Sequence, residues 1–488
     1  MRIIQRIHNK LNWSRRRYVS VVIGLLALGY LASASYHTLK PLPEGLDYTG
    51  KLRHAQVNFL TDQTYIDAQG KQQQEHRIFK EMLKMIEEAQ STIVMDMFLF
   101  NQQVGDSQLE HEQLTQELTD ALIIKRRLSP QVEIFVITDP VNSVYGGIQP
   151  EHYRQLRQGG IELIETNLVP LRASNPAWSG FWYICCQDIG NNPQKGWLPN
   201  PLGTEKVTIR SYMDLFNFKA NHRKTLVVDT IDGWKGLVTS MNPHDGSSRH
   251  SNVALTVKGM TAIDLLKTEQ AVGMMSKGNI PFVVIKDVEA AKTEPQVQVL
   301  TEKAIYDGVL DMINTAQKAG TEIDIAMFYL SERKIIKALI AAHERGVKVR
   351  VLLDPNKDAF GRTKNGIPNR PVASELHDAG IDVRWCNTQG EQCHSKMILK
   401  RTAYQADMIL GSANFTARNL KNYNLETDLR VIGLKDAQVF KDASQYFNTA
   451  WSNLDGKQMS VDYSKYADES TLKYAMYRFM EWSGLSTF

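Results

Sequence analysis

The chain has 488 residues, of which 43% are hydrophobic and 23% are charged, and its formal net charge is +4. A chain of this length and apolar content can bury two cores, which fits a pair of lobes. The small positive charge argues against an extended nucleic-acid groove, because such grooves are strongly basic.

A basic leader and an apolar segment open the chain. Residues 1–17 contain six Lys or Arg and no acid, and Tyr18 to Tyr36 is a run of 19 residues without a charge. At about 1.5 Å per residue this run spans a bilayer core. The positive-inside rule then predicts a membrane anchor with its basic end in the cytoplasm. The alternative is a cleaved signal peptide ending at Ala32-Ser33-Ala34. Both readings place the rest of the chain on the extracytoplasmic, or periplasmic, side.

Helix-like and strand-like stretches then recur in two series. In each series a helix precedes the first of three apolar strands. The first series comprises a helix at 78–89 and strands at 92–99, 132–139 and 160–163; the second comprises a helix at 304–318 and strands at 322–329, 347–354 and 380–383. Such an alternation predicts an α/β protein with two α-β-α sandwich lobes and mixed sheets.

One set of polar residues occurs once in each series at identical spacing. The two copies are His222, Lys224, Ser240 and Asn242, and His394, Lys396, Ser412 and Asn414. Each Ser lies 18 positions beyond its His, and each Asn lies 20 positions beyond it. Both H-x-K units open apolar runs typical of buried strands. Residues two apart on a strand point to the same face, so each His and Lys should project into one pocket.

These residue types indicate chemistry at phosphorus. One histidine can attack phosphorus, and the other can protonate the departing oxygen. The two lysines with the Ser and Asn donors would hold the non-bridging oxygens, where negative charge builds in the transition state. Because side chains supply the positive charge, we expect no metal and no other cofactor.

The duplicated motif resembles that of the phospholipase D superfamily, H-x-K-x4-D followed by G-S-x-N. The first copy supplies His222, Lys224 and Asp229, with Thr239 in place of the Gly. The second supplies Gly411-Ser412-Ala413-Asn414, with Arg401 in place of the Asp. The resemblance covers about residues 55–455 and is closest in character to bacterial phospholipase D and cardiolipin synthase-like proteins. It implies pseudo-twofold lobes with the active site at their seam.

Glu426 breaks the symmetry between the two halves. It matches a Glu that orients an active-site His in the family, and its counterpart by sequence offset is Ala254. A carboxylate beside one His would fix its tautomer and raise its pKa. The resemblance implies that His222 is the nucleophile and His394 the general acid, then the base. The predicted catalytic residues are His222, Lys224, Asp229, His394, Lys396 and Glu426; the predicted substrate-binding residues are Ser240, Asn242, Ser412 and Asn414.

The first lobe carries an aromatic insert near 167–217 that the second lobe lacks. It contains Trp178, Phe181, Trp182, Tyr183 and Trp197. A long loop before a catalytic strand is often functional, so the insert is predicted to be a lid or an element that enters a lipid interface. A surface subdomain with its own packing is the equal alternative.

The four cysteines are Cys185, Cys186, Cys386 and Cys393. An extracytoplasmic location permits disulfides, but the sequence gives no connectivity. A bridge at Cys393 would brace the strand that begins beside His394. A Cys-His metal site is the competing reading, although the spacing does not resemble a zinc motif.

An aromatic tail follows the second lobe. Its residues Tyr466, Tyr474, Tyr477, Phe479, Met480 and Trp482 predict the apolar side of a helix. Packing on the second lobe is favoured over membrane contact, because lipid binding needs a basic opposite face. The predicted domains are a leader and anchor at 1–36, lobes at 37–290 and 291–455, and the tail at 456–488.

Three functions compete. The favoured one is phosphodiester cleavage in phospholipids through a phosphohistidine, as phospholipase D or as a cardiolipin synthase-like phosphatidyltransferase. The second is a nuclease or other phosphodiesterase of the same superfamily, and the third is a non-catalytic lipid-binding membrane protein. The expected partners are the phospholipid membrane and an anionic or zwitterionic phospholipid, with no nucleic acid. Because one chain holds both copies of the motif, a monomeric catalytic unit is expected.

Overall fold

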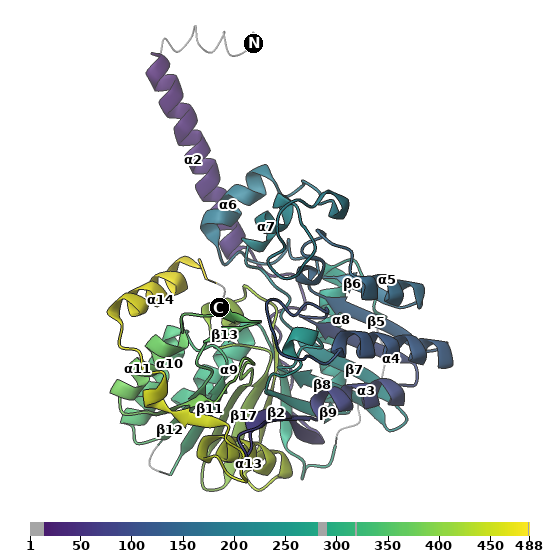
Figure 1. Cartoon of the computed structure of the whole chain (residues 1–488), viewed down its shortest axis with the longest axis vertical. Helices are drawn as coiled ribbons and strands as arrows, with labels where there is room; N and C mark the ends of the chain where they lie inside the picture. The colour runs from purple at the N-terminus through teal and green to yellow at the C-terminus, as the bar shows by residue number, and fades with distance from the viewer. Residues whose placement is uncertain (1–13, 282–289, 318–319, 487) are drawn as a thin grey trace.

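The structure, a computed structural model, describes residues 14–281, 290–317, 320–486 and 488. Most of the predicted basic leader, residues 1–13, lies outside the described residues. Two α/β lobes lie side by side, and a long N-terminal helix projects from one end of the molecule (Figure 1). The prediction of an α/β fold with two lobes and mixed sheets is confirmed.

The first lobe is built on an eight-stranded sheet in the order β3-β2-β9-β8-β7-β4-β5-β6. Strands β4, β5 and β6 are parallel, and the other neighbours are antiparallel. The bounds are β2 Val57–Ile66, β3 Gln72–His76, β4 Thr92–Met97, β5 Glu133–Thr138, β6 Glu162–Glu165, β7 Lys224–Thr230, β8 Gly233–Thr239 and β9 Asn252–Lys258. Strand β4 is buried along its whole length, because helices or the second lobe cover both faces.

The second lobe repeats this order in a nine-stranded sheet, β1-β10-β18-β17-β16-β11-β12-β15-β19. Its strands β11, β12 and β15 are parallel, as are β4, β5 and β6 in the first lobe. The bounds are β1 Arg53–His54, β10 Gln296–Thr301, β11 Glu322–Met327, β12 Lys348–Leu353, β15 Asp382–Cys386, β16 Lys396–Arg401, β17 Gln405–Gly411, β18 Thr427–Leu434 and β19 Ser460–Asp462.

The sheet boundaries correct the predicted domain boundaries. Strand β1 falls in the predicted first lobe, 37–290, yet it pairs with β10 of the second sheet. Strand β19 falls in the predicted tail, 456–488, yet it pairs with β15. Both segments are short and supply edge strands, whose pairing depends on tertiary contacts that the local sequence does not specify.

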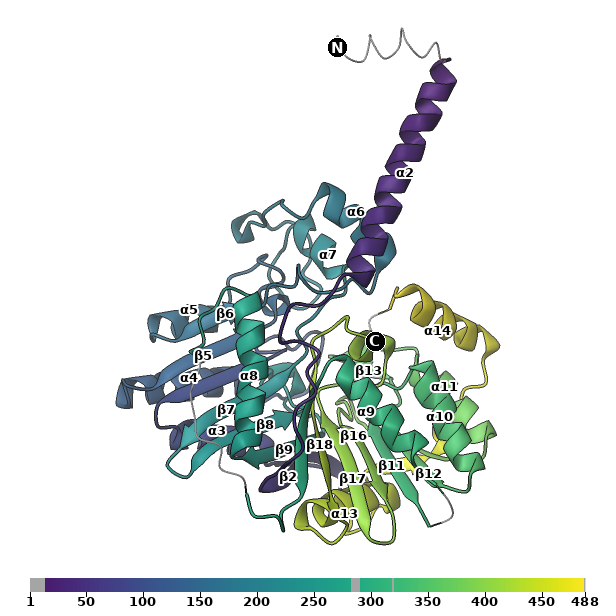
Figure 2. The ribbon, with the colours of Figure 1, turned by 180° about the vertical axis from the view of Figure 1, so that it is seen from behind.

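Helices cover the outer face of each sheet. In α3, Ile78, Met82, Met85 and Ile86 are buried at the helical spacing of an apolar stripe. Each lobe has an apolar core under its outer helices. A third core joins the two lobes and includes residues of α8 and α13, two helices that Figure 2 shows. The bounds are α3 Ile78–Glu88, α4 Leu114–Leu128, α5 Glu151–Gln158, α8 Met260–Met275, α9 Lys303–Asn314, α10 Arg333–Glu344, α11 Asn369–Asp378 and α13 Gln438–Ser452. Shorter elements are β13 Asp358–Ala359, β14 Arg362–Thr363 and α12 Ala417–Leu420.

The predicted anchor is part of helix α2, Arg15–Leu39. Among the described residues it is the single helix long and apolar enough to cross a membrane, and its most apolar stretch is not buried in the protein. The end of α2 packs beside α6, Pro176–Cys185, in the insert (Figure 1).

The insert folds into a small unit of its own. Helix α6 and helix α7, Ile209–Leu215, enclose a core of Trp182, Tyr183 and Cys186. This matches the subdomain alternative for part of the insert. Phe181 and Trp197 nevertheless remain exposed to solvent, so the insert also presents aromatic surface.

The aromatic tail forms helix α14, Thr471–Ser483. Tyr477 is fully buried against the second lobe, and Tyr474 and Met480 pack there as well. The expectation that Phe479 and Trp482 share this packed side is wrong, because both are exposed. Tyr466 precedes the helix and packs on the same core.

Candidate active site

Both copies of the motif meet at the seam between the lobes. His222 and His394 lie two residues before the starts of β7 and β16, the strands in the middle of each sheet. They line a cavity of about 340 Å³ together with Asn242 and Asn414. A larger surface groove of about 840 Å³, between α3 and α4, contains none of the predicted site residues.

Each histidine is held by the backbone of the opposite lobe. The His222 amide donates to the Leu425 carbonyl at 2.9 Å, and the His394 amide donates to the Ser251 carbonyl at 2.8 Å. The two contacts are related by the internal symmetry of the chain. The positions of the two imidazoles therefore depend on how the lobes dock.

The side-chain partners of the two histidines differ in charge. His222 Nδ1 lies 2.8 Å from Glu426 Oε1, whereas His394 Nδ1 lies 3.2 Å from Asn252 Oδ1. Again each partner comes from the opposite lobe. One imidazole faces a carboxyl group and the other a neutral amide, which makes the two histidines chemically inequivalent.

The structural counterpart of Glu426 is Asn252, which corrects the assignment of Ala254. Ser412 Oγ donates to Glu426 Oε2, and Ser240 Oγ donates to Asn252 Oδ1 at 3.2 Å. The separation within the pair is 14 residues in the second half and 12 in the first. A connection two residues shorter after β8 shifts the register, so a constant sequence offset points to the wrong residue.

The two serines support the site from behind the cavity, whose lining excludes them. Besides the bonds to Glu426 and Asn252, Ser412 Oγ accepts from the Thr427 amide and Ser240 Oγ accepts from the Val253 amide. Both hydroxyls are thus engaged in holding Glu426 and Asn252 and the start of the following strands.

The two asparagines of the motif line the cavity. Asn242 Oδ1 accepts from the Leu99 amide at 3.2 Å. Asn414 is buried and its Oδ1 has no hydrogen-bond partner. Buried amides are normally paired, so the side chain of Asn414 keeps hydrogen-bonding capacity at the cavity wall.

The two lysines are buried behind the histidines. Lys224 Nζ donates to the His222 carbonyl at 2.6 Å, and Lys396 Nζ donates to the His394 carbonyl at 2.9 Å. Each ammonium group also lies over an aromatic ring, Phe98 for Lys224 at 5.0 Å and Phe328 for Lys396 at 5.2 Å. The same rings pack against His222 and His394.

Burial disfavours positive charge throughout this cavity. It lowers the pKa of Lys224 to about 7 and that of Lys396 well below its usual range. It also lowers the pKa of His222 and His394, with further contributions from the neighbouring lysines. A bound anion would supply the missing countercharge and raise all four pKa values. The electrostatics of the site therefore favour an anionic ligand.

Asp229 lies away from the site, which corrects its assignment as a catalytic residue. Its carboxylate accepts from the backbone amides of Ser91 and Thr92 and from the Ser91 hydroxyl. Asp229 is near the end of β7, whereas Lys224 begins this strand. A rise of about 3.3 Å per residue carries Asp229 away from the seam, where it fixes the start of β4.

Asp139 and Asp354 hold the loops that carry His222 and His394, and neither was predicted as a site residue. Asp139 Oδ2 accepts from the amide of Asn221, the residue before His222, at 2.7 Å. Asp354 Oδ2 accepts from the amide of Cys393, the residue before His394, at 2.8 Å. Burial raises the pKa of Asp139 to about 7 and that of Asp354 to about 6. The sequence signal for both is an Asp-Pro pair that ends corresponding strands of the repeat.

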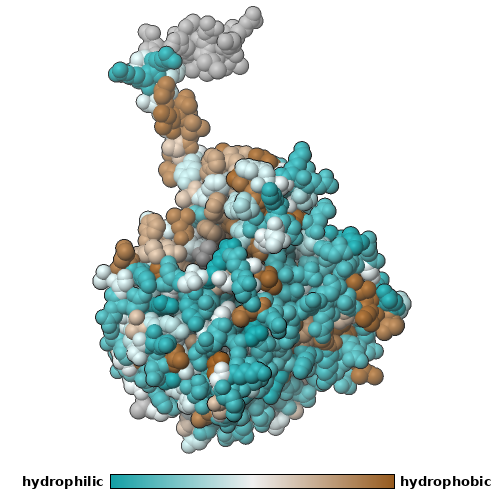
Figure 3. Space-filling model, in the orientation of Figure 1, coloured by the Kyte–Doolittle hydropathy of each residue, from teal (hydrophilic) through white to brown (hydrophobic). Residues whose placement is uncertain are grey.

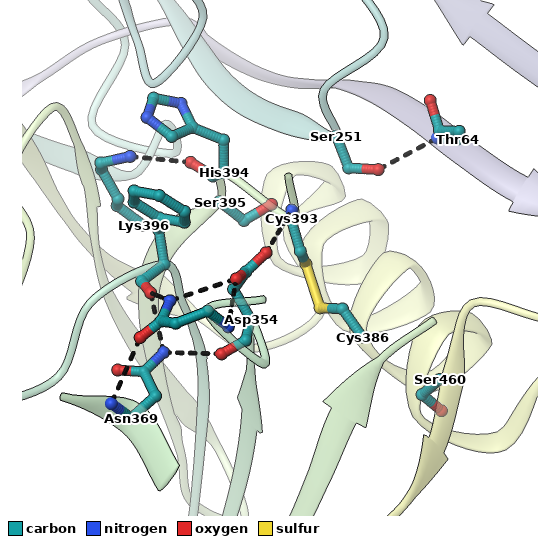
Figure 4. Close-up of a disulfide and its surroundings, with 12 residues drawn as sticks. Thr64, Ser251, Asp354, Asn369, Cys386, Cys393, His394, Ser395, Lys396 and Ser460 are labelled. Carbon is teal, nitrogen blue, oxygen red and sulfur yellow. Dashed lines mark hydrogen bonds between the residues drawn. A yellow bond between two sulfur atoms is a disulfide. The ribbon is translucent and has the colours of Figure 1, made fainter. Parts of the chain in front are cut away.

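The loop before His394 is also tied by a disulfide. Figure 4 shows Cys386, at the end of β15, bonded to Cys393, with Asp354 and Asn369 below the loop. Asn369 Nδ2 donates to the Phe328 carbonyl. The structure also pairs the adjacent Cys185 and Cys186. The Cys386–Cys393 bridge ties the residue before His394 to the end of β15. This is the bridge expected to brace the strand that begins beside His394.

Further basic and apolar residues line the rest of the cavity. Lys219 and Arg418 lie on the side of the insert, and Lys364 lies near β14. The apolar lining includes Leu215, Phe218 and Phe488. A cavity with cations and an apolar wall is suited to an amphiphilic anion.

Comparisons with known proteins agree with this architecture. The family described as cardiolipin synthase, PLD-like domain, matches residues 309–451. Mitochondrial cardiolipin hydrolase from Mus musculus is 26% identical over 142 residues, which are 29% of this chain and 57% of that protein. The chain thus spans little more than half the length of this curated relative. Phosphatidylserine synthase from Haemophilus influenzae Rd KW20 aligns with a TM-score of 0.55 and 11% identity, over 93% of this chain and 98% of that one.

The predicted resemblance to the phospholipase D superfamily is confirmed by the matching family model and by the curated relative. The match to the cardiolipin synthase, PLD-like domain lies within the second lobe. The synthase structure shares the fold alone at its low identity.

Proposed function

We propose that this protein cleaves a phosphodiester bond of a phospholipid through a covalent phosphohistidine, as a phospholipase D or a phosphatidyltransferase. The observation that carries the proposal is that two buried histidines line one cavity at the seam, and that a residue of the opposite lobe contacts Nδ1 of each. An imidazole bonded through Nδ1 keeps Nε2 for the reaction. The match to the cardiolipin synthase PLD-like domain supports the substrate class.

His222 acts as the nucleophile. Its Nε2 forms a bond to phosphorus while the bond between phosphorus and the leaving alcohol oxygen breaks. His394 gives a proton to that oxygen and is left as a neutral base. In the second step His394 takes a proton from water or a lipid alcohol, whose oxygen displaces His222 from phosphorus.

Glu426 supports the assignment of His222. The reactive form has a proton on Nδ1 shared with an ionised carboxylate, which stabilises positive charge on the imidazole after attack. Ser412 and Asn419 both donate to this carboxylate. These bonds and the charge of Lys224 oppose the rise that burial causes in the pKa of Glu426.

Lys224, Lys396 and Asn414 stabilise the phosphoryl oxygens. The substrate phosphate restores the charge of the buried lysines, so binding and electrostatic stabilisation are coupled. The apolar cavity wall with Leu215, Phe218 and Phe488 accommodates the lipid part of the substrate.

The protein is anchored by α2 as a single span, with the catalytic lobes outside the cytoplasm. Arg15, Arg16 and Arg17 at the start of α2 favour a cytoplasmic N-terminus. The Cys386–Cys393 bridge is consistent with an oxidising compartment.

The test is analysis of lipid products formed by the purified full chain in mixed micelles of phosphatidylglycerol and phosphatidylethanolamine. Cardiolipin with glycerol would identify a phosphatidyltransferase, and phosphatidic acid a phospholipase. His222→Ala and His394→Ala should abolish either activity, whereas His343→Ala on α10, outside the cavity lining, should not.

Reactions with phosphorus-labelled lipid, quenched with a denaturing detergent at mildly alkaline pH where a phosphorus–nitrogen bond survives, should trap label on wild-type protein and none on His222→Ala. Absence of lipid turnover by a folded wild-type protein would refute the proposal. The next substrate would then be single-stranded DNA, the predicted alternative.

A further inference from the structure

Helix α14 carries an apolar surface on the side that faces away from the protein. Its inner side is fixed by Tyr477, which is fully buried and donates to the Ser331 carbonyl. On the outer side Leu472 is 77% exposed, Met476 40%, Phe479 53% and Trp482 83%. A water-facing helix side is normally polar. A contiguous row of large apolar side chains therefore indicates a contact surface.

Helix α6 presents a second apolar surface and is joined to the predicted membrane span. Phe181 is 49% exposed and Ile184 is 60% exposed. Tyr30 of α2 donates its hydroxyl to the Ala177 carbonyl at 2.8 Å. Gly180 approaches Ala34 so closely that an added Cβ would lie 2.8 Å from the Ala34 side chain. The two helices are therefore in direct contact.

The length of the span places α6 at the membrane surface. A bilayer core requires about 20 helical residues. Counted from Tyr18, such a span reaches about His37, just past the end of the charge-free run. Tyr30 and Ala34 lie within this stretch, and both contact α6. The outward side of α6 consequently lies at the boundary between hydrocarbon and head groups.

Helices α2, α6 and α14 gather at one end of the molecule. Figures 1 and 2 show α14 at the end of the lobes from which α2 projects, and α6 beside the base of α2. In Figure 3 this end carries hydrophobic surface next to the projecting helix. Two separate helices thus expose apolar residues toward the side where the membrane must lie.

The cavity borders both helices. Phe218 follows the insert and lines the cavity, and Phe216 beside it packs on Trp178 of α6. Arg418 lines the cavity, donates to Ser174 of the insert and also donates to the carbonyl of Gly484, the residue after α14. The cavity wall is therefore continuous with the insert and with the end of α14.

We propose that the outward sides of α6 and α14 form a membrane-docking face, defined by Phe181, Ile184, Leu472, Met476, Phe479 and Trp482. This face enters the interfacial layer of the bilayer that α2 spans. It holds the cavity at the surface, so that a lipid passes from the leaflet between the insert and α14. The path of the lipid rests on the proposed function, whereas docking itself does not.

Depth-dependent fluorescence quenching tests the docking face. The full chain is reconstituted in phosphatidylglycerol and phosphatidylcholine vesicles with brominated acyl chains, as wild type, Trp482→Phe and Trp451→Phe. Trp451 belongs to α13, at the opposite end of the molecule from α2 (Figure 1). We expect Trp482→Phe to remove part of the quenched emission and Trp451→Phe to leave it unchanged. Equal quenching of wild type and Trp482→Phe would overturn the proposal.

A second experiment separates docking from chemistry. Leu472→Ser with Phe479→Ser should lower turnover of vesicle lipid roughly tenfold or more, because two interfacial apolar contacts are lost. Turnover of a soluble short-chain phospholipid should be retained. The matched control, Ile231→Ser with Tyr404→Ser, alters two exposed apolar residues in the turns after β7 and β16 and should change neither.

The outcomes distinguish the two proposals. Equal loss on both substrates, or no loss on vesicles, would contradict the docking face. Quenching at Trp482 in a wild-type protein that turns over no lipid would instead refute the proposed function and leave the docking face supported.

Discussion

At the scale of single residues, the important feature is the exchange of partners between the lobes. Glu426 faces His222, and Asn252 faces His394. Glu426 and Asn252 occupy equivalent positions, because each accepts a hydrogen bond from the serine of its own motif copy, Ser412 or Ser240. Only Glu426 can carry a charge. This difference supports a nucleophile at His222 and a proton donor at His394, because a carboxylate stabilises an imidazole that gains positive charge.

Glu426→Gln should lower kcat by roughly 10²–10⁴-fold, because the amide can favour the wrong His222 tautomer. Burial raises the pKa of Glu426 well above 4.5, and the reactive form needs this group ionised. Wild-type activity should therefore decline with falling pH already above the ordinary carboxyl range. The glutamine variant should lose that acidic limb in a pH profile of kcat/KM, and an unchanged limb would contradict the role of Glu426.

Asn252→Asp should move the opposite limb. A carboxylate beside His394 raises the pKa of that imidazole, so the acid stays protonated to higher pH. The alkaline limb should shift upward by about one pH unit or more. Asn252→Leu, which removes the acceptor without adding charge, is the control and should lower the rate without an upward shift.

Among the elements, the start of β7 is held by buried polar contacts that include residues of both lobes. Arg223, between the two motif residues His222 and Lys224, pairs with Glu302 at 2.7 Å and with Glu269 at 3.5 Å. Glu302 also accepts from the Glu426 amide at 3.1 Å. The start of β7 is thereby linked to the edge of the second sheet and to the residue that orients His222.

Arg223→Ala should destabilise the fold by about 3–5 kcal/mol, because it leaves two buried carboxylates without their cation. Thermal unfolding of the detergent-solubilised full chain measures the effect. Arg154→Ala on α5, which removes an exposed pair with Glu151, should leave the melting temperature unchanged. Similar melting temperatures for the two variants would show that the buried network does not hold the seam.

In the whole molecule, two lobes line one cavity, and helix α2 packs on the insert beside it. The apolar part of α2 is not buried, whereas the lobes share a core that includes Val227, Leu255, Met397 and Leu429. The folding of the lobes should therefore be independent of the span.

Removal of residues 1–29, which keeps the contacts of Tyr30 and Ala34 with α6, should leave the melting temperature of the lobes within a few degrees and preserve turnover of micellar lipid. Sedimentation with vesicles should show weaker but detectable binding, because the docking face remains. Loss of folding on truncation would show that α2 is a structural helix of the catalytic body. Micellar activity, thermal unfolding and vesicle binding are measured on the same preparation.

Much of this protein follows from the sequence because the evidence is local and repeated. The spacing of His222 and Lys224 with Ser240, matched by His394, Lys396 and Ser412, predicted two strands with one chemistry. The apolar run Tyr18–Tyr36 predicted a helix of membrane length. Residue type and short-range spacing suffice for such features, because strand and helix periodicity determine which side chains share a face.

Other features depend on tertiary contacts. Asn252 became the partner of His394 through strand pairing and a connection shorter by two residues. Asp229 lies outside the site because it is near the far end of β7, several residues along the strand from Lys224. Trp482 faces outward because Tyr477 fixes the orientation of α14. Residue type and spacing were therefore enough to predict the polar groups and the strands that carry them, whereas the docking of the lobes decided which of these groups meet, since contacts between distant segments have no local signature.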